Sequence, residues 1–187
     1  MLNSESLNNV LENKVISRQD IMEIYQNAVE DSSELFSVAQ NLREKFKKDS
    51  VTFSKKVFFN IVNLCKDTCS YCTYKAEPDE KKLSLMSKQQ ILELLQLAKK
   101  YRCVEALFVT GERPEQKYQE ARDWLKENGF KSTAEYLIHA SELSLELGLF
   151  PHTNAGNLNL EEMRELKKTN VSMGIMLENV SERLTEK

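Results

Sequence analysis

Residues 56–72, KVFFNIVNLCKDTCSYC, decide the fold expected of this chain. The first nine are a continuous apolar, β-branched and aromatic run, which is typical of a strand buried on both faces. The run ends at Cys65, and Cys69 and Cys72 follow within the next seven positions. The segment therefore predicts a buried strand with a thiol-rich loop at its C-terminal end.

Strands and helices alternate after this segment. Further strands are expected at residues 104–111, 149–155 and 171–177, and the intervening helices at 87–98, 114–129, 132–148 and 159–167. Ser-x-x-Gln and Ser-x-x-Glu patterns start two of these helices, and glycines end two of them. Such alternation predicts an α/β fold with a parallel sheet and right-handed crossovers.

The domain organisation follows from the same pattern. Residues 1–50 are polar with helical periodicity, and they predict a helical N-terminal segment that covers one end of the main domain. Residues 51–187 hold four expected strands, whereas a complete (β/α) barrel needs about 250 residues. We therefore expect the first half of a partial TIM-like barrel, truncated at the C-terminus. In such a sheet the loops after the strands converge on one face.

Composition narrows the class of partner. The 26 Lys and Arg residues against 29 Asp and Glu residues leave a net charge of -3, so no basic field favours nucleic acid or an anionic membrane. No apolar run approaches the roughly 20 residues of a membrane-spanning helix, and the N-terminus lacks a signal-peptide layout. A cytoplasmic protein that acts on small molecules is expected.

The cysteines form a C-x3-C-x2-C motif. Three closely spaced thiolates can hold three corners of a 4Fe-4S cluster and leave the fourth iron open. That iron can chelate the amino and carboxylate groups of S-adenosyl-L-methionine, whose reductive cleavage yields a 5′-deoxyadenosyl radical. A structural zinc site is the alternative, with Cys103, His139 or His152 as a fourth ligand. A ferredoxin pattern would need a fourth cysteine soon after Cys72.

Other candidate ligand-binding residues lie near the expected strand ends. Tyr71 is placed to cover the cluster, or it fills the core. Gly111 allows close backbone approach, and Glu112 can pair with the ammonium of S-adenosylmethionine or lie in a surface turn. Further polar contacts to the ribose or carboxylate are expected from Asn154, Ser172 and Glu178. The remaining expectations are a structural or substrate-facing His152, solvated Lys75 and Arg113, and core positions for Met173, Met176 and Cys103.

Beyond these motifs, the chain resembles a family of radical SAM enzymes, the 7,8-didemethyl-8-hydroxy-5-deazariboflavin synthases (subunit 1). The resemblance covers roughly residues 50–187. It rests on the segments 51–76, 110–119, 151–160 and 172–184. Thr110 departs from the radical SAM pattern, because many members carry the first glycine of a Gly-Gly-Glu motif there.

The resemblance implies a specific reaction. A companion radical SAM subunit joins tyrosine to a ribityldiaminouracil, and this subunit cyclises the adduct with loss of ammonia to form the deazaflavin chromophore. An electron donor would reduce the cluster. Two alternatives remain, namely the companion subunit itself and a zinc-stabilised module without enzymatic activity.

Overall fold

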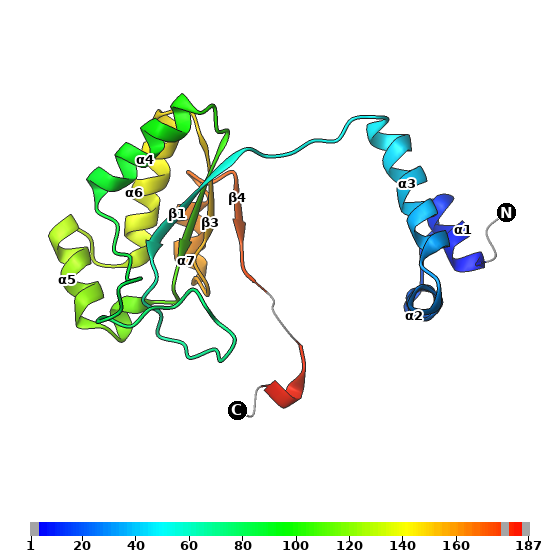
Figure 1. Cartoon of the computed structure of the whole chain (residues 1–187), viewed down its shortest axis with the longest axis horizontal. Coiled ribbons are helices and arrows are strands. Elements are labelled where there is room, and N and C mark those ends of the chain that lie inside the picture. Colours follow the sequence, from blue (N-terminus) through cyan, green and yellow to red (C-terminus); the bar gives the residue numbers. More distant parts are fainter. Residues whose placement is uncertain (1–3, 177–179, 185–187) are drawn as a thin grey trace. The chain divides into compact units, whose positions relative to one another are not determined.

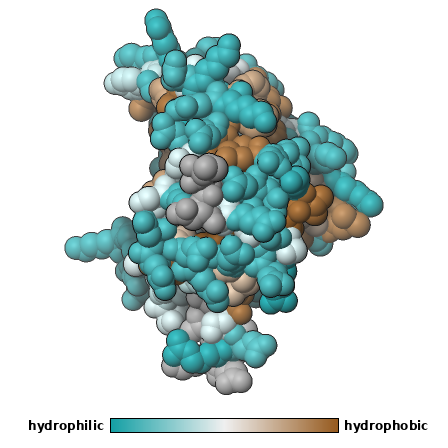
Figure 2. Space-filling model, turned by 90° about the vertical axis from the view of Figure 1, so that its right-hand side faces the viewer, coloured by the Kyte–Doolittle hydropathy of each residue, from teal (hydrophilic) through white to brown (hydrophobic). Residues whose placement is uncertain are grey.

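The computed structural model describes residues 4–176 and 180–184. The chain divides into two compact units, Met1–Phe53 and Ser54–Lys187 (Figure 1). No helix among the described residues is long and apolar enough to cross a membrane. The surface seen in Figure 2 is mostly hydrophilic, with hydrophobic patches between the hydrophilic residues.

The first unit contains three helices, α1 (Glu5–Leu11), α2 (Arg18–Glu30) and α3 (Ser33–Lys47). A capping box starts α2, because the Ser17 side chain accepts from the backbone of Asp20 and the Asp20 carboxylate accepts from Ser17 N. Ser6 Oγ is 2.9 Å from Asp20 and 3.0 Å from Glu23, which ties α1 to α2. The helical N-terminus is thus confirmed.

The second unit is a four-stranded parallel sheet in the order β1-β2-β3-β4. Its strands are β1 (Lys56–Val62), β2 (Glu105–Thr110), β3 (Phe150–Asn154) and β4 (Ser172–Gly174). The helices are α4 (Lys88–Lys100), α5 (Gln119–Asn128), α6 (Thr133–Glu146) and α7 (Leu160–Leu166), with short 3-10 turns η1 (Pro114–Gln116) and η2 (Glu182–Leu184). The predicted α/β fold with parallel strands is confirmed.

The core of this unit lies between the sheet and the helices. α4 packs against β1, and α6 packs against β2 and β3 (Figure 1). Phe59 and Phe108 meet in this layer with ring centroids 4.8 Å apart. The strands were expected to be buried on both faces, but Phe58 on the opposite face is 52% exposed. That expectation was wrong because helices cover one face of the sheet and a cavity lies along the other.

The largest boundary difference concerns the fourth strand. β4 pairs with β3 over only three residues, whereas the sequence predicted a strand over residues 171–177, of which Leu177 lies outside the described residues. Met173 is 37% exposed and Met176 is 66% exposed. Their predicted core positions are therefore wrong, since β4 has a strand partner on one side only within the described sheet.

A second difference lies after Pro114. The sequence predicted one helix from residue 114, but η1 ends at Gln116 and Tyr118 is extended, with φ -104° and ψ 135°, before α5 begins. Gly129 ends α5 as predicted, because its φ of 85° is a conformation that glycine adopts without strain.

Candidate functional site

The cysteine loop begins where β1 ends. All three cysteines are free thiols; Cys65 is partly buried, whereas Cys69 and Cys72 are exposed. Cys72 N donates to Cys69 O at 3.1 Å, and the returning chain is fixed by Ala76 N, which donates to Asn63 O at 2.9 Å. The loop therefore starts and ends beside the C-terminal end of β1.

Gly111, just after β2, lets the backbone of the next loop lie directly against this site. A Cβ atom at Gly111 would lie 2.0 Å from Leu64 O and 2.8 Å from Cys65 Cβ. The adjacent Glu112 N donates to Cys65 Sγ at 3.2 Å, and Lys66 N donates to Glu112 O at 2.9 Å. The first cysteine is thus held against the end of β2 by close packing and two hydrogen bonds.

The carboxylate of Glu112 is buried, so the surface-turn alternative is excluded. Its Oε2 accepts a hydrogen bond from Asn157 N at 2.6 Å, and its Oε1 lies 3.7 Å from Arg113 Nε. Arg113 also donates to both carboxylate oxygens of Glu162 on α7, at 3.0 and 2.7 Å. Glu112 therefore joins the loops that follow β2 and β3.

A cavity of about 640 Å³ runs along the open face of the sheet. Its lining combines residues of the sheet, the cysteine loop and the loops after β2 and β3: Lys56, Phe58, Asp67, Tyr71, Tyr74, Leu107, Val109, Thr110, Glu112, His152, Asn154, Gly156, Asn157, Ile175 and Met176. Thr110 Oγ1 is buried and has no hydrogen-bond partner among the described residues. The cavity is thus mostly apolar along β1 and β2, and polar groups come from Lys56, from His152 on β3, and from residues at or after the C-terminal ends of the strands.

Tyr74 fastens the cysteine loop to the sheet. Its hydroxyl donates to the side chain of Asn60 and lies 3.2 Å from Val62 O and 3.1 Å from Val109 O. Burial raises the pKa of Tyr74, and the nearby Cys65 and Cys72 raise it further. The hydroxyl therefore stays protonated and can keep donating to the strand ends.

The structure brings four of the six other predicted site residues to this cavity or its edge. Tyr71, Glu112 and Asn154 line it, and Gly111 lies beside them. Ser172 approaches it only through His152, whose Nδ1 lies 2.6 Å from Ser172 Oγ. Glu178 lies outside the described residues.

Two predicted solvated charges are instead paired. Lys75 Nζ lies 2.9 Å from Glu77 Oε1, with 15% of the lysine side chain exposed, and Arg113 makes the two-pronged contact with Glu162. Cys103 packs against the core, as expected for a small apolar side chain.

Comparison with known proteins places this arrangement in a family. A model of the radical SAM superfamily matches residues 59–187. The chain belongs to the radical SAM superfamily. In structure it resembles methylornithine synthase, with a TM-score of 0.64 at 15% identity, over 91% of this chain and 47% of that one. This likeness concerns the fold, and it agrees with the first strands of a barrel-like sheet.

Among radical SAM proteins, several deazariboflavin synthases are similar in sequence. The 7,8-didemethyl-8-hydroxy-5-deazariboflavin synthase of Methanopyrus kandleri is 42% identical over 137 residues, which are 73% of this chain and 41% of that protein. Its counterpart in Methanosarcina barkeri is 43% identical over 70% of this chain and 40% of that protein. FO synthase of Mycobacterium leprae is 41% identical over 73% of this chain and 16% of its own length. The chain thus spans less than half the length of these relatives.

Radical SAM proteins generally use a 4Fe-4S cluster, and the donor set here suits one. Three thiols lie in one loop, and Glu112 N already donates to the sulfur of Cys65. Within the described parts of the chain, no three Cys, His, Asp or Glu side chains are gathered closely enough to hold a metal ion. The three cysteines fit a cluster by the chemistry of their thiols and by their spacing in the sequence, and ligation would have to bring their sulfur atoms closer together than they lie here.

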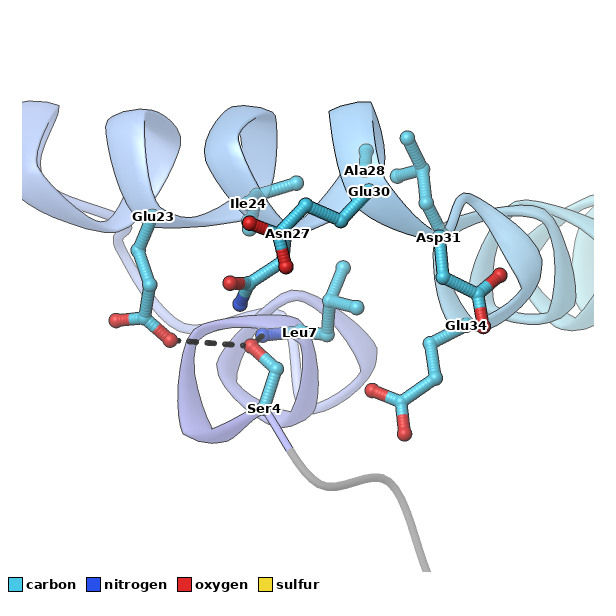
Figure 3. Close-up of a pocket in the computed structure, with 10 residues that line it drawn as sticks. Ser4, Leu7, Glu23, Ile24, Asn27, Ala28, Glu30, Asp31 and Glu34 are labelled. Atoms are coloured by element: carbon cyan, nitrogen blue, oxygen red, sulfur yellow. Dashed lines mark hydrogen bonds between the residues drawn. The ribbon is translucent and has the colours of Figure 1, made fainter.

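A second cavity, of about 350 Å³, lies within the helical unit. The carboxylates of Glu23, Glu30 and Glu34 gather around it, and Ser4 Oγ donates to Glu23 Oε1 at 3.4 Å (Figure 3). Among the described residues that line it, there is no cysteine, histidine or cationic side chain. Of these two cavities, the one beside the sheet is lined by residues of the cysteine loop, namely Asp67, Tyr71 and Tyr74.

Sequence reasoning missed several lining residues of the sheet cavity, chiefly Phe58, Leu107, Val109 and Tyr74. The first three alternate along their strands with buried residues, but the sequence is apolar at both kinds of position, so no alternation of polarity marks the open face. Tyr74 carries no such signal, because its contacts depend on how the loop returns to the sheet.

Proposed function

We propose that this chain forms the cluster-binding and S-adenosylmethionine-binding part of a radical SAM enzyme of deazaflavin biosynthesis. The observation that carries the proposal is the position of three free thiols in one loop at the C-terminal end of β1, beside a cavity that continues along the sheet. In this proposal Cys65, Cys69 and Cys72 ligate a 4Fe-4S cluster. When bound, that cluster supplies the electron that cleaves the carbon-sulfur bond of S-adenosylmethionine.

The chain's own residues would bind and orient the cosubstrate. Glu112 is a buried carboxylate that lines the cavity, and it is suited to pair with the ammonium of the methionine moiety. Asn154 offers an amide for the ribose or carboxylate, and Tyr71 offers an aromatic ring close to the last cysteine. The backbone contact from Glu112 to Cys65 would couple cosubstrate position to cluster position.

For the substrate, we propose a tyrosine-ribityldiaminouracil adduct that is cyclised to 7,8-didemethyl-8-hydroxy-5-deazariboflavin with loss of ammonia. The names and identities of the relatives support this assignment. The resemblance of residues 110–119 and 151–160 to the same family supports it further. A companion radical SAM subunit would supply the adduct, and a separate electron donor would reduce the cluster.

The ligand set is tested by anaerobic reconstitution followed by iron and sulfide analysis. We expect about four irons per chain, and loss of the cluster when any one of Cys65, Cys69 and Cys72 is changed to Ala. Cys103→Ala is the matched control, because this thiol packs against the core and should leave the iron content unchanged. One tightly bound zinc per chain, or cluster loss in the control, would contradict the ligand assignment.

The role of Glu112 is tested separately with the reduced, reconstituted protein. Addition of S-adenosylmethionine should alter the electron paramagnetic resonance spectrum. In Glu112→Gln the same change should need roughly tenfold or more cosubstrate, since a charge-assisted hydrogen bond is worth about 1.5–3 kcal/mol. Equal affinity of the two proteins would leave Glu112 with a purely structural role.

Formation of the adduct from free tyrosine, in place of its cyclisation, would assign the chain to the companion subunit.

A further inference from the structure

His152 lies midway along the open face of the sheet, one step below the polar end of the cavity. In the register of β3 it is two residues before Asn154, and it pairs with Leu107 of β2 and Ser172 of β4. Residues two apart in a strand point to the same face, so His152 and Asn154 both line the cavity. The imidazole is therefore about 7 Å deeper along the strand than Asn154.

One ring nitrogen of His152 is already engaged. Nδ1 is hydrogen-bonded to Ser172 Oγ at 2.6 Å and lies 3.9 Å from Glu105 Oε1. Hydrogen bonds from Ser54 and Lys56 lower the pKa of Glu105, so this carboxylate is ionised at neutral pH. The Glu105 oxygen that faces Nδ1 is also paired with Lys56 Nζ at 2.9 Å, and it favours the tautomer that carries its proton on Nδ1. In that tautomer Nδ1-H donates to Ser172 Oγ.

In the tautomer with the proton on Nδ1, the other nitrogen, Nε2, is a hydrogen-bond acceptor. Among the described residues it has no hydrogen-bond partner. Gly174 on β4 lies beside it, and a Cβ atom there would be 3.5 Å from Nε2. The missing side chain leaves room next to the ring, so the lone pair of Nε2 is available to a ligand in the cavity.

The walls around His152 indicate what that ligand would be. Phe58, Leu107 and Val109 cover the neighbouring sheet positions, so this section of the cavity is mostly apolar. The charged Lys56, which is paired with Glu105, lies two residues before Phe58 on β1. An acceptor beside mostly apolar side chains that include an aromatic ring suits a planar heteroaromatic ring that carries N-H donors at its edge.

We infer that His152 is a substrate-binding residue whose Nε2 accepts a hydrogen bond from a ring N-H of a uracil-like heterocycle. Ser172 and Glu105 are positioning residues, because they orient the imidazole without facing the ligand. The inference rests on the proposed function, since the substrate proposed there contains a diaminouracil ring. It adds the protein atom that would recognise that ring.

The experiment measures binding to the cluster-free protein by isothermal titration calorimetry. The probes are 5,6-diaminouracil and 5,6-diamino-1,3-dimethyluracil, which differ in having or lacking ring N-H donors. Wild-type protein should bind the unmethylated probe about tenfold more tightly. His152→Leu should abolish this preference by weakening the unmethylated probe and leaving the methylated probe nearly unchanged. A general loss of structure would instead weaken both probes.

His139→Leu is the matched control, because this histidine packs against Phe130 away from the cavity. It should retain the tenfold preference, and Ser172→Ala should show an intermediate one. The inference is overturned if His152→Leu retains the preference, or if wild-type protein binds neither probe or both equally. Loss of cluster binding or of the response to S-adenosylmethionine, with the probe preference intact, would count against the proposed function alone.

Discussion

At the scale of single residues, Gly111 is a position in the site that leaves no space for a side chain. Two loops meet there backbone to backbone. The atom nearest to an added Cβ is the backbone oxygen of Leu64, which cannot rotate out of the way as the end of a flexible side chain could. The requirement is one of space, because a side chain at this position would separate Cys65 from the amide of Glu112.

Gly111→Ala should therefore lower the free energy of unfolding by about 1–3 kcal/mol, the usual cost of overpacking. Urea denaturation measures this change, and the rate of thiol alkylation should show Cys65 becoming more accessible. Gly174→Ala is the matched control, since its added Cβ would make only ordinary contact with His152. An unchanged midpoint for Gly111→Ala would mean that the two loops separate without cost.

At the scale of elements, an ion pair connects η1 to the start of α7 and supports the loops around Glu112. Arg113 has a φ of 35° and donates twice to Glu162, whose carboxylate also accepts from Asn159 N at 2.8 Å. The pair is mostly buried, with 21% and 17% of the two side chains exposed. These hydrogen bonds, the one from Arg113 first, lower the pKa of Glu162.

Glu162→Gln should cost about 1.5–3 kcal/mol of stability at pH 7, because charge-assisted hydrogen bonds are lost. The folded-state pKa is lowered, so the contribution of Glu162 is complete above the unfolded pKa of about 4.3 and disappears as the pH falls through the folded value. Urea denaturation at several pH values should show the wild type and variant converging in acid.

Glu165→Gln is the matched control on the same helix. Its ion pair with Lys168 is exposed, so its effect should stay within about 0.5 kcal/mol at every pH. A constant difference between wild type and Glu162→Gln from pH 7 into acid would show that shape, rather than charge, matters at position 162.

At the scale of the whole molecule, the chain is organised as two compact units joined near residue 53. Residues 50–55 have no regular structure, and Val51 and Phe53 are largely exposed. Lys55, by contrast, is tied to the sheet, because Val104 N donates to Lys55 O at 2.8 Å. The basic residues on the N-terminal side of this irregular segment, Lys47 and Lys48, lie at the end of α3.

Limited trypsin digestion should cut first after Lys47 or Lys48 and leave residues 49–187 intact, since proteases cut segments that open locally at little cost. Mass spectrometry identifies the fragments, and circular dichroism shows whether the large one melts as the intact chain does. Replacing both lysines by Gln should slow this cleavage. First cuts within residues 56–176 would contradict two separately folded domains with a boundary near residue 50.

The sequence by itself determined the order of strands and helices and the family of the chain. These properties are local, because apolar runs, capping patterns and cysteine spacing act over a few neighbouring residues. Ser87 and Gln90, for example, form the capping box that their spacing predicts. The radical SAM assignment likewise depends on short segments that are read directly from the chain.

Only the tertiary structure decided which face of the sheet is open and which side chains meet there. Phe58 and Phe59 have the same hydrophobicity, yet one lines the cavity and the other is fully buried, because helices pack on only one side. The buried carboxylate of Glu112 is hydrogen-bonded to the backbone of Asn157, which is 45 positions away in the sequence. His152 is oriented by Ser172, which is 20 positions away. No local pattern encodes such contacts, since they depend on the register of parallel strands and the crossovers between them.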